Sequence, residues 1–178
     1  QQGQPERTAA LLNTANTVDE LVLRARAEAA QGHATTATIA KLASLLEEAA
    51  QWRVVVLQAQ CALDRNDAAA AVQVLAPSIA SLADVALAQQ VWAQALAATT
   101  QRLGEALLAS RRAMRLAPGD GTNFATYGYV LLQRNQPRAA VRALDLAHRL
   151  SPADAEIALH LAQALAADGA PRSAATLA

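Results

Sequence analysis

The side chains that most often do chemistry in proteins are few in this sequence and stand far apart. The three histidines, His33, His148 and His160, do not have the spacing of a metal-binding motif such as H-E-x-x-H. Cys61 is the only cysteine, which excludes an intrachain disulfide and a cysteine-rich metal site. Its apolar neighbours indicate a small buried hydrophobic side chain. We therefore expect no metal and no cofactor.

Acidic residues also offer no catalytic pair. Glu47 and Glu48 are neighbours in the sequence, and adjacent side chains on a helix diverge, so the two carboxylates cannot act on one substrate atom. Neither the G-x-S-x-G motif nor a Walker phosphate-binding loop is present. We expect no catalytic residues and a protein that is not an enzyme.

The composition predicts an all-helical protein. Of the residues, 53% are hydrophobic but only 3% are aromatic, and alanine dominates the apolar set. Alanine is the strongest helix former, whereas strands are enriched in aromatic and β-branched residues. Small side chains at the contacts favour closely packed helices, and we expect almost no strand.

Charge and hydropathy leave the compartment open. The formal charge is balanced overall, and the shift from the acidic first half to the basic second half is too mild to indicate a polyanion partner. No apolar run reaches the roughly 18 residues that a membrane span needs. The best candidate, 68–88, is interrupted by Gln73, Pro77 and Asp84. We see no signal peptide and expect no transmembrane segment.

The most informative stretch is 121–154. Phe124, Tyr127 and Leu131 recur at helical spacing, which predicts a first helix with one apolar face. Gly128, among them, lets a neighbouring helix come close. The break at 135–137 ends this helix, because the residue before a proline avoids the α conformation. A second helix is predicted over about 138–150, and Pro152 ends it. Three of its residues face the first helix: Ala140, Leu144 and Ala147.

In this order, these residues resemble the tetratricopeptide repeat, a helix–turn–helix unit of about 34 residues with the pattern W-x2-L-G-x2-Y…A-x3-F…P. Pro118 and Pro152 stand 34 residues apart. Alanines in the small position of the second helix recur every 34 or 35 residues: Ala37, Ala71, Ala106, Ala140 and Ala174. The resemblance implies a right-handed α-solenoid of stacked helix pairs.

The resemblance covers about 17–178, after a lead-in over 1–16. We expect units at about 17–50, 52–83, 84–118, 121–152 and 155–178, of which the first is degenerate and the last incomplete. The second helix of the first unit is expected over about 35–50, and the first helix of the last unit over about 155–167. Pro77 shortens the second helix of the second unit, so 78–83 forms an extra turn or lengthens the next helix. Terminal repeats normally carry a polar cap. The C-terminal end has none, so we expect a segment of a longer protein, or an end covered by another chain, including self-association.

In this family the first helices line a concave groove that takes a peptide or a partner helix. The corresponding positions are mainly apolar or uncharged polar, which suits an apolar or amide-bonding segment. They hold Arg53, Val56, Gln60, Val91, Ala95, Ala125, Tyr129, Gln133, Leu159 and Gln163. Tyr129 serves equally well as a packing residue. Lysine and asparagine, with which related co-chaperones grip a C-terminal carboxylate, are missing from these positions.

A set of arginines lies on the second helices, which in this family form the outer wall: Arg111, Arg112, Arg115, Arg142 and Arg149. We interpret them as a solvated face, supported by pairs such as Asp145 and Arg149 at i,i+4. The alternative is a patch for an acidic partner or for nucleic acid, although no aromatic residues are interleaved to stack on bases.

These patterns lead to one main hypothesis and two alternatives. The chain is expected to be a non-catalytic scaffold or adaptor that binds another protein. Alanine richness, with Lys41 as the only lysine, suggests a high-GC bacterial source. By analogy we lean toward a periplasmic or membrane-associated envelope assembly for secretion, pili or polysaccharide export. The first alternative is a docking or regulatory domain of a larger enzyme. The second is binding of nucleic acid through the arginines.

Overall fold

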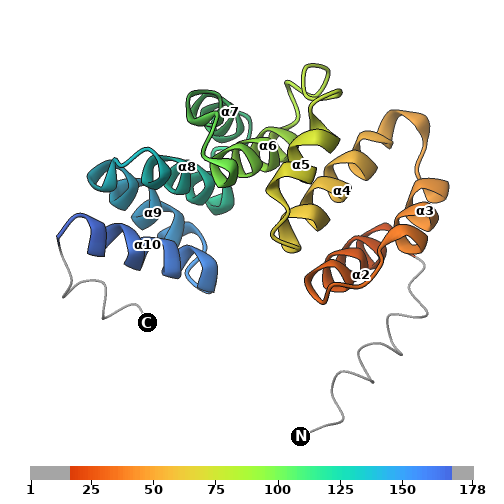
Figure 1. Cartoon of the computed structure of the whole chain (residues 1–178), viewed down its shortest axis with the longest axis horizontal. Helices are drawn as coiled ribbons and strands as arrows, with labels where there is room; N and C mark the ends of the chain where they lie inside the picture. The colour runs from red at the N-terminus through yellow and green to blue at the C-terminus, as the bar shows by residue number, and fades with distance from the viewer. Residues whose placement is uncertain (1–16, 170–178) are drawn as a thin grey trace, which may run out of the picture. The chain divides into compact units, whose positions relative to one another are not determined.

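The structure, a computed structural model, describes residues 17–169 as helices joined by short turns (Figure 1). The residues described contain no strand, which confirms the all-α prediction. The chain divides into two compact units, Gln1–Leu75 and Ala76–Ala178. The expected lead-in over 1–16 and the helix around Ala174 lie outside the described residues.

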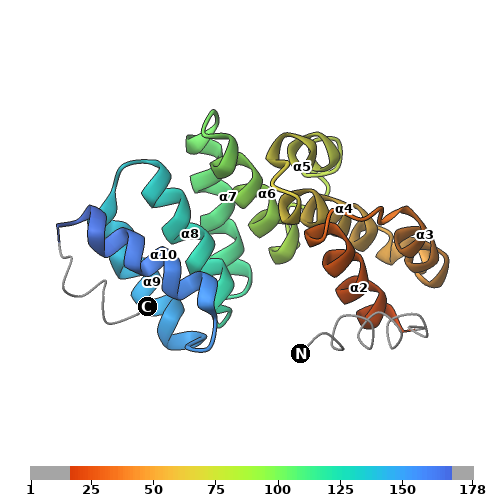
Figure 2. The same cartoon turned by 60° about the horizontal axis from the view of Figure 1, so that its bottom comes forward.

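The first unit consists of two helix pairs with a short 3-10 turn between them. Its elements are α2 (Val18–Ala30), α3 (Thr36–Leu45), η1 (Glu48–Ala50), α4 (Trp52–Asp64) and α5 (Ala68–Leu75). Helix α2 packs against both α3 and α4, and α4 packs against α5 (Figure 2). Leu21, Leu42 and Leu57 fill the core between them and are at most 2% exposed.

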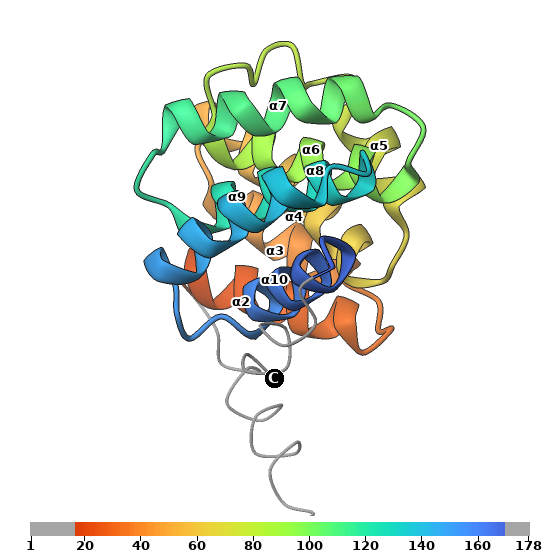
Figure 3. The same ribbon diagram turned by 90° about the vertical axis from the view of Figure 1, so that its left-hand side faces the viewer.

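The second unit, as far as residue 169, stacks two helix pairs and one further helix. Its elements are α6 (Ala86–Thr99), α7 (Leu103–Leu116), α8 (Gly121–Gln133), α9 (Pro137–Leu150) and α10 (Ala155–Ala167). Figure 3 shows α7 at the top and α10 at the bottom, with α8 and α9 between them. The first helices contact each other in series, α6 with α8 and α8 with α10. This stacking of helix pairs is the arrangement that the repeat pattern implies.

The turn inside each described pair depends on one residue in the left-handed conformation. At the end of α8, Asn135 has φ 56°. The N–H of Asn135 donates to the carbonyl oxygen of Leu132 at 2.9 Å. The N–H of Gln136 donates to the carbonyl oxygen of Leu131, also at 2.9 Å. These are the two bonds of a Schellman motif, and they also occur at Gly32 and Asn66. Asparagine thus ends α8, and Pro137 then occupies the first turn of α9.

Helices α8 and α9 approach closely at Gly128, as the sequence predicts. A Cβ atom at this position would lie 2.5 Å from Cγ of Leu144. Leu144, Ala140 and Ala147 are fully buried on the facing side of α9. The small residue on α8 therefore accommodates the large residue on α9, and the two backbones come together around them.

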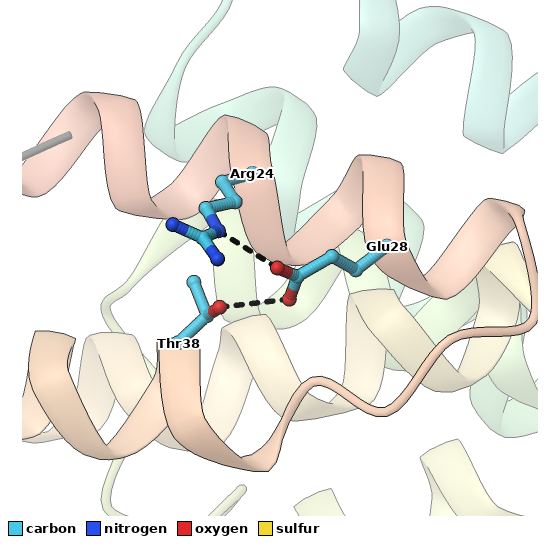
Figure 4. A network of polar contacts seen from close by, with 3 residues as sticks. All are labelled: Arg24, Glu28 and Thr38. Atoms are coloured by element: carbon cyan, nitrogen blue, oxygen red, sulfur yellow. Dashed lines mark hydrogen bonds and ion pairs between the residues drawn. The ribbon is translucent and has the colours of Figure 1, made fainter. Parts of the chain in front are cut away.

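The second helix of the first unit differs from the repeat pattern. Ala37 is exposed, and α3 instead buries Thr38, Ile39 and Leu42. The Oγ1 hydroxyl of Thr38 donates to Oε2 of Glu28 at 2.7 Å, and Nε of Arg24 donates to Oε1 of the same carboxylate at 2.7 Å (Figure 4). A polar bridge thus joins α2 to α3, where a small alanine was expected.

Helix α3 is also shorter than the sequence predicts. It ends at Leu45 rather than near residue 50. The side-chain amide of Gln51 donates to the carbonyl oxygens of Ala43 and Leu46, at 3.0 and 2.8 Å. These carbonyls lie at the C-terminal end of α3, where the helix itself supplies no donor, so Gln51 caps the helix from outside.

The second helix of the following pair is short, as Pro77 predicts. Helix α5 ends at Leu75, and 76–84 forms consecutive turns before α6 begins at Ala86. The residues between are therefore an extra turn rather than an extension of α6. Ala71, Ala106 and Ala140, expected at the small contact positions, are all fully buried.

Candidate functional site

Four of the predicted groove residues lie on two helices that contact each other. Tyr129 and Gln133 belong to α8, and Leu159 and Gln163 belong to α10. Tyr129 and Gln133 are half-buried, whereas Leu159 and Gln163 are exposed. The stacking of first helices thus places residues about 30 positions apart in the sequence on neighbouring elements, as expected for a unit of this length.

An aromatic stack joins α8 to α10. The rings of Tyr129 and His160 have centroids 5.0 Å apart and are tilted by 30°. Leu159, the neighbour of His160, is 57% exposed and adds an apolar surface beside this stack. We define the α8–α10 patch as Tyr129, Gln133, Leu159, His160 and Gln163. His160 was not among the predicted groove residues, and its only signal in the sequence was its position beside Leu159.

The environment keeps the α8–α10 patch uncharged near neutral pH. Burial raises the pKa of Tyr129, and the nearby Glu156 carboxylate raises it further. Burial lowers the pKa of His160, although Glu156 and Asp154 act in the opposite direction. A neutral phenol, a neutral imidazole, two amides and an exposed leucine can make apolar contacts and hydrogen bonds with a peptide.

The lowered pKa of His160 predicts a pH-dependent stability. The unfolded chain binds more protons than the folded chain below the ordinary histidine pKa of about 6.5. The second unit should therefore lose stability as the pH falls from 7.5 to 5.5. Urea unfolding of wild type and His160→Asn at both pH values measures this effect. A smaller loss in the variant is expected, and an equal loss in both proteins would contradict the role of His160.

In the first unit the predicted groove residues are less available. Arg53 on α4 forms an ion pair of 3.7 Å with Asp19 on α2. Gln60 is half-buried. Val56 is only 1% exposed, so the structure assigns it to the packed interior. In the second unit the small groove positions are buried in the same way and are at most 8% exposed: Val91, Ala95 and Ala125. The periodicity places such residues on a face but does not say what covers that face.

The structure confirms that Cys61 is a packing residue. Its side chain is fully buried in the core of the first unit. Burial, followed by the charge of Asp64, raises the pKa of the thiol to about 11, so the reactive thiolate is disfavoured at neutral pH. Among residues 17–169 no group of three or more histidine, cysteine or carboxylate side chains is arranged to hold a metal ion.

The arginines of the second helices have different surroundings. Asp145 and Arg149 form the expected i,i+4 ion pair at 3.0 Å. Arg111 lies over the ring of Tyr127, with its guanidinium carbon 5.9 Å from the ring centroid. Arg112 and Arg115 instead line a hollow beside α6. The arginines therefore do not form a single uniform patch.

Comparison with solved structures identifies the fold. A thermophilic TPR protein of Thermus thermophilus, TTC0263, has a TM-score of 0.74 at 16% identity, over 90% of this chain and 88% of that chain. The described helices therefore have the fold of tetratricopeptide repeat proteins. MamA has a TM-score of 0.59 at 14% identity, over 80% of this chain and 82% of that chain.

A third similar structure is much longer. An O-GlcNAc transferase mutant of Thermobaculum terrenum has a TM-score of 0.61 at 22% identity, over 67% of this chain. This tetratricopeptide-like chain spans only 23% of that transferase chain. No family model and no curated protein matches the sequence. In the described part, no helix combines the length and apolarity needed to cross a membrane.

Proposed function

We propose that the chain is a non-catalytic scaffold that binds a peptide or helix of another protein on its first helices. The observation that carries the proposal is the α8–α10 patch, where exposed Leu159 adjoins the Tyr129–His160 stack. Large aromatic and apolar side chains dominate the free energy of protein binding, and surrounding amides supply directional hydrogen bonds. The tetratricopeptide-like fold supports a protein-interaction role in general.

The α8–α10 patch can be tested with peptides selected on the protein itself. A displayed random peptide library is selected against the chain, and the Kd of the best peptide is measured by fluorescence anisotropy. Tyr129→Ala and Leu159→Ala are each expected to raise the Kd about tenfold, because each removes a large contact side chain. Gln133→Ala and Gln163→Ala should have smaller effects, since each removes only amide hydrogen bonds.

The control for the patch is Arg142→Ala, which changes an exposed side chain on α9. It should leave the Kd unchanged. Circular dichroism of every variant establishes that the helices are intact. If the selected peptides bind Tyr129→Ala and Leu159→Ala as tightly as wild type but fail to bind Arg112→Glu, the partner uses another surface and the proposal is wrong. Arg53 and Gln60 in the first unit are proposed as separate contacts, and Arg53→Ala and Gln60→Ala are each expected to raise the Kd less than Tyr129→Ala does in the same assay.

A second candidate function is a docking domain of a larger enzyme. The observation that favours it is the similarity to 23% of the length of an O-GlcNAc transferase chain. Sequencing the gene on both sides of the coding region for this chain discriminates between the two functions. A catalytic domain in the same reading frame would favour the docking domain.

We also infer a bacterial envelope assembly as the setting, from the alanine-rich, lysine-poor composition and by analogy. Fractionation of the source cells with an antibody against the chain tests this inference. Recovery in the cytoplasmic fraction would exclude it.

A further inference from the structure

A hollow lies beside α6 and α7 in the second unit, on different helices from the α8–α10 patch. Its volume is about 350 Å³, within the range of roughly 300–1,000 Å³ typical of ligand-binding clefts. Its most buried lining side chains come from α6 and α7. Trp92, Gln89 and Ala109 line it and are at most 6% exposed. We call this hollow the α6–α7 pocket.

Hydrogen bonds hold the remaining wall of the α6–α7 pocket in place. Ile79 and Ala80 line the pocket from the turns at 76–84. The next residue but one, Leu82, is buried, and its carbonyl oxygen accepts a hydrogen bond of 3.1 Å from the side-chain amide of Gln89. The N–H of Leu82 donates to the carbonyl oxygen of Ser78 at 3.1 Å. The wall is thus ordered before a ligand arrives, which lowers the entropic cost of binding.

The one carboxylate in the lining of the α6–α7 pocket is already engaged. Oε1 of Glu105 accepts a hydrogen bond of 3.1 Å from the indole N–H of Trp92. Its Oε2 atom lies 2.5 Å from Nη2 of Arg102, whose guanidinium carbon also lies 5.5 Å from the centroid of the Trp92 ring. Glu105 is therefore neutralised by a cation outside the pocket.

Two arginines of the lining keep their charge uncompensated. Arg112 and Arg115 are exposed, and within residues 17–169 neither has an ion-pair partner. Together with Leu108 they stand at i, i+4 and i+7, which places all three side chains on one face of α7. Leu108 is 67% exposed and lines the pocket. The opening of the pocket thus combines an exposed apolar side chain with two free cations.

We propose that the α6–α7 pocket is a second docking site, which takes an acidic peptide segment of another protein that carries one large apolar side chain. The apolar side chain enters beside Leu108 and Ile79, and neighbouring carboxylates pair with the guanidinium groups of Arg112 and Arg115. Charge complementarity selects the occupant, because the positive opening excludes basic segments. The shape selects a peptide over nucleic acid, because Trp92 is buried and offers no exposed ring for a base to stack on.

The test uses the full chain and a defined probe. The probe is a fluorescein-labelled peptide of about twelve glutamate and serine residues with one central phenylalanine. In matched peptides, lysine replaces the glutamates or serine replaces the phenylalanine. The acidic phenylalanine peptide is expected to bind with a Kd of roughly 10–100 μM, as suits a small site. Each matched peptide should bind at least tenfold more weakly.

The two tryptophans locate the bound probe. The chain contains only Trp52, in the first unit, and Trp92, in the pocket, so an ¹H–¹⁵N spectrum shows two indole signals. Trp92→Phe assigns them. The acidic phenylalanine peptide is expected to shift the Trp92 signal and to leave the Trp52 signal in place, because only Trp92 donates its indole N–H within the pocket.

Variants of exposed side chains complete the test without threatening the fold. Leu108→Asp, and separately the double change Arg112→Gln with Arg115→Gln, should each weaken the probe at least tenfold. The control Arg142→Gln removes an exposed arginine on α9 and should have no effect. Tyr129→Ala should also have no effect, which separates this site from the α8–α10 patch.

Several outcomes would overturn the proposal. These are the absence of a shift in the Trp92 signal, equal binding of the serine-substituted peptide, and tighter binding of a single-stranded oligonucleotide of equal charge. If Tyr129→Ala loses probe binding and Leu108→Asp keeps it, the peptide binds at the α8–α10 patch. Such a result would count against the pocket and in favour of the first-helix site.

Discussion

Replacing Gly128 with alanine is expected to destabilise the second unit by about 1 kcal/mol, and by up to about 2 kcal/mol if Leu144 cannot shift. Alanine is a better helix former than glycine by about 1 kcal/mol. Against this gain, the new Cβ atom would lie 2.5 Å from Cγ and 3.0 and 3.2 Å from the two Cδ atoms of Leu144. Leu144 is fully buried, and overpacking a buried side chain costs about 1–3 kcal/mol. The clash therefore outweighs the gain in helix propensity.

Gly104 provides a matched control within the same unit. It also lies in a helix, near the start of α7, but a Cβ atom there would meet nothing within 4 Å. Gly104→Ala should leave stability unchanged or raise it by up to about 1 kcal/mol. Urea unfolding is followed by Trp92 fluorescence in a Trp52→Phe background, so that only the second unit reports. Equal effects of the two alanines would show that the α8–α9 contact is looser than described.

A double-mutant cycle then assigns the cost to Leu144. Leu144→Ala alone should cost about 2–5 kcal/mol, as for other buried leucines. In the double variant with Gly128→Ala, the loss of unfolding free energy should be smaller than the sum of the two single losses by about 1–3 kcal/mol. The reason is that the extra methyl group fills part of the cavity. Additive losses would mean that the two positions do not share this space.

Replacing Asn123 with aspartate is expected to cost about 3 kcal/mol or more at neutral pH. Asn123 is 2% exposed, and its Nδ2 atom donates to the carbonyl oxygens of Ala113 and Ala117, at 3.4 and 3.2 Å. Ala113 lies in the last turn of α7 and Ala117 is the C-cap residue of that helix, so α8 caps α7 through this amide. Aspartate has the same shape but would place a buried negative charge against two acceptors.

The size and pH dependence of the loss test this role of Asn123. Asn123→Ala removes the donor without adding a charge and should cost less, about 1–2 kcal/mol. Burial should raise the pKa of the introduced carboxyl, and its protonated form can donate a hydrogen bond. The deficit of Asn123→Asp should therefore shrink as the pH falls from 8 to 5, measured against Asn123→Ala by urea unfolding. A constant deficit, or one no larger than that of alanine, would exclude a buried donor at this position.

Most of the helices could be predicted because their signals are local. The expected bounds of the last described helix, 155–167, agree with α10, whose N-cap Asp154 accepts from the N–H groups of Glu156 and Ile157. The turn at 135–137 was placed correctly, but its main cause is Asn135 in the left-handed conformation rather than the proline. Helix α3 was predicted too long because its cap comes from Gln51, beyond the end of the helix.

The candidate sites were only partly predictable. Repeat spacing correctly indicated that Tyr129 and Leu159 belong to adjacent first helices, because a regular stack brings equivalent positions together. The same spacing predicted Val56 as a groove residue, whereas the structure buries this side chain in the packed interior. The α6–α7 pocket had no sequence signal, since it depends on Ile79 folding back toward Trp92 through the irregular turns at 76–84.

The order of small, large and turn-forming residues alone determined that this chain forms antiparallel helix pairs, because helix periodicity, glycine contacts and helix ends depend on neighbours within a few positions. Which side chains remain exposed was decided only by tertiary packing. Leu108 and Leu159 are open to solvent, whereas Val56 and Val91 are covered, although all four are apolar side chains on helices. Burial depends on what the adjacent helices and irregular turns cover, and those contacts join residues far apart in the sequence.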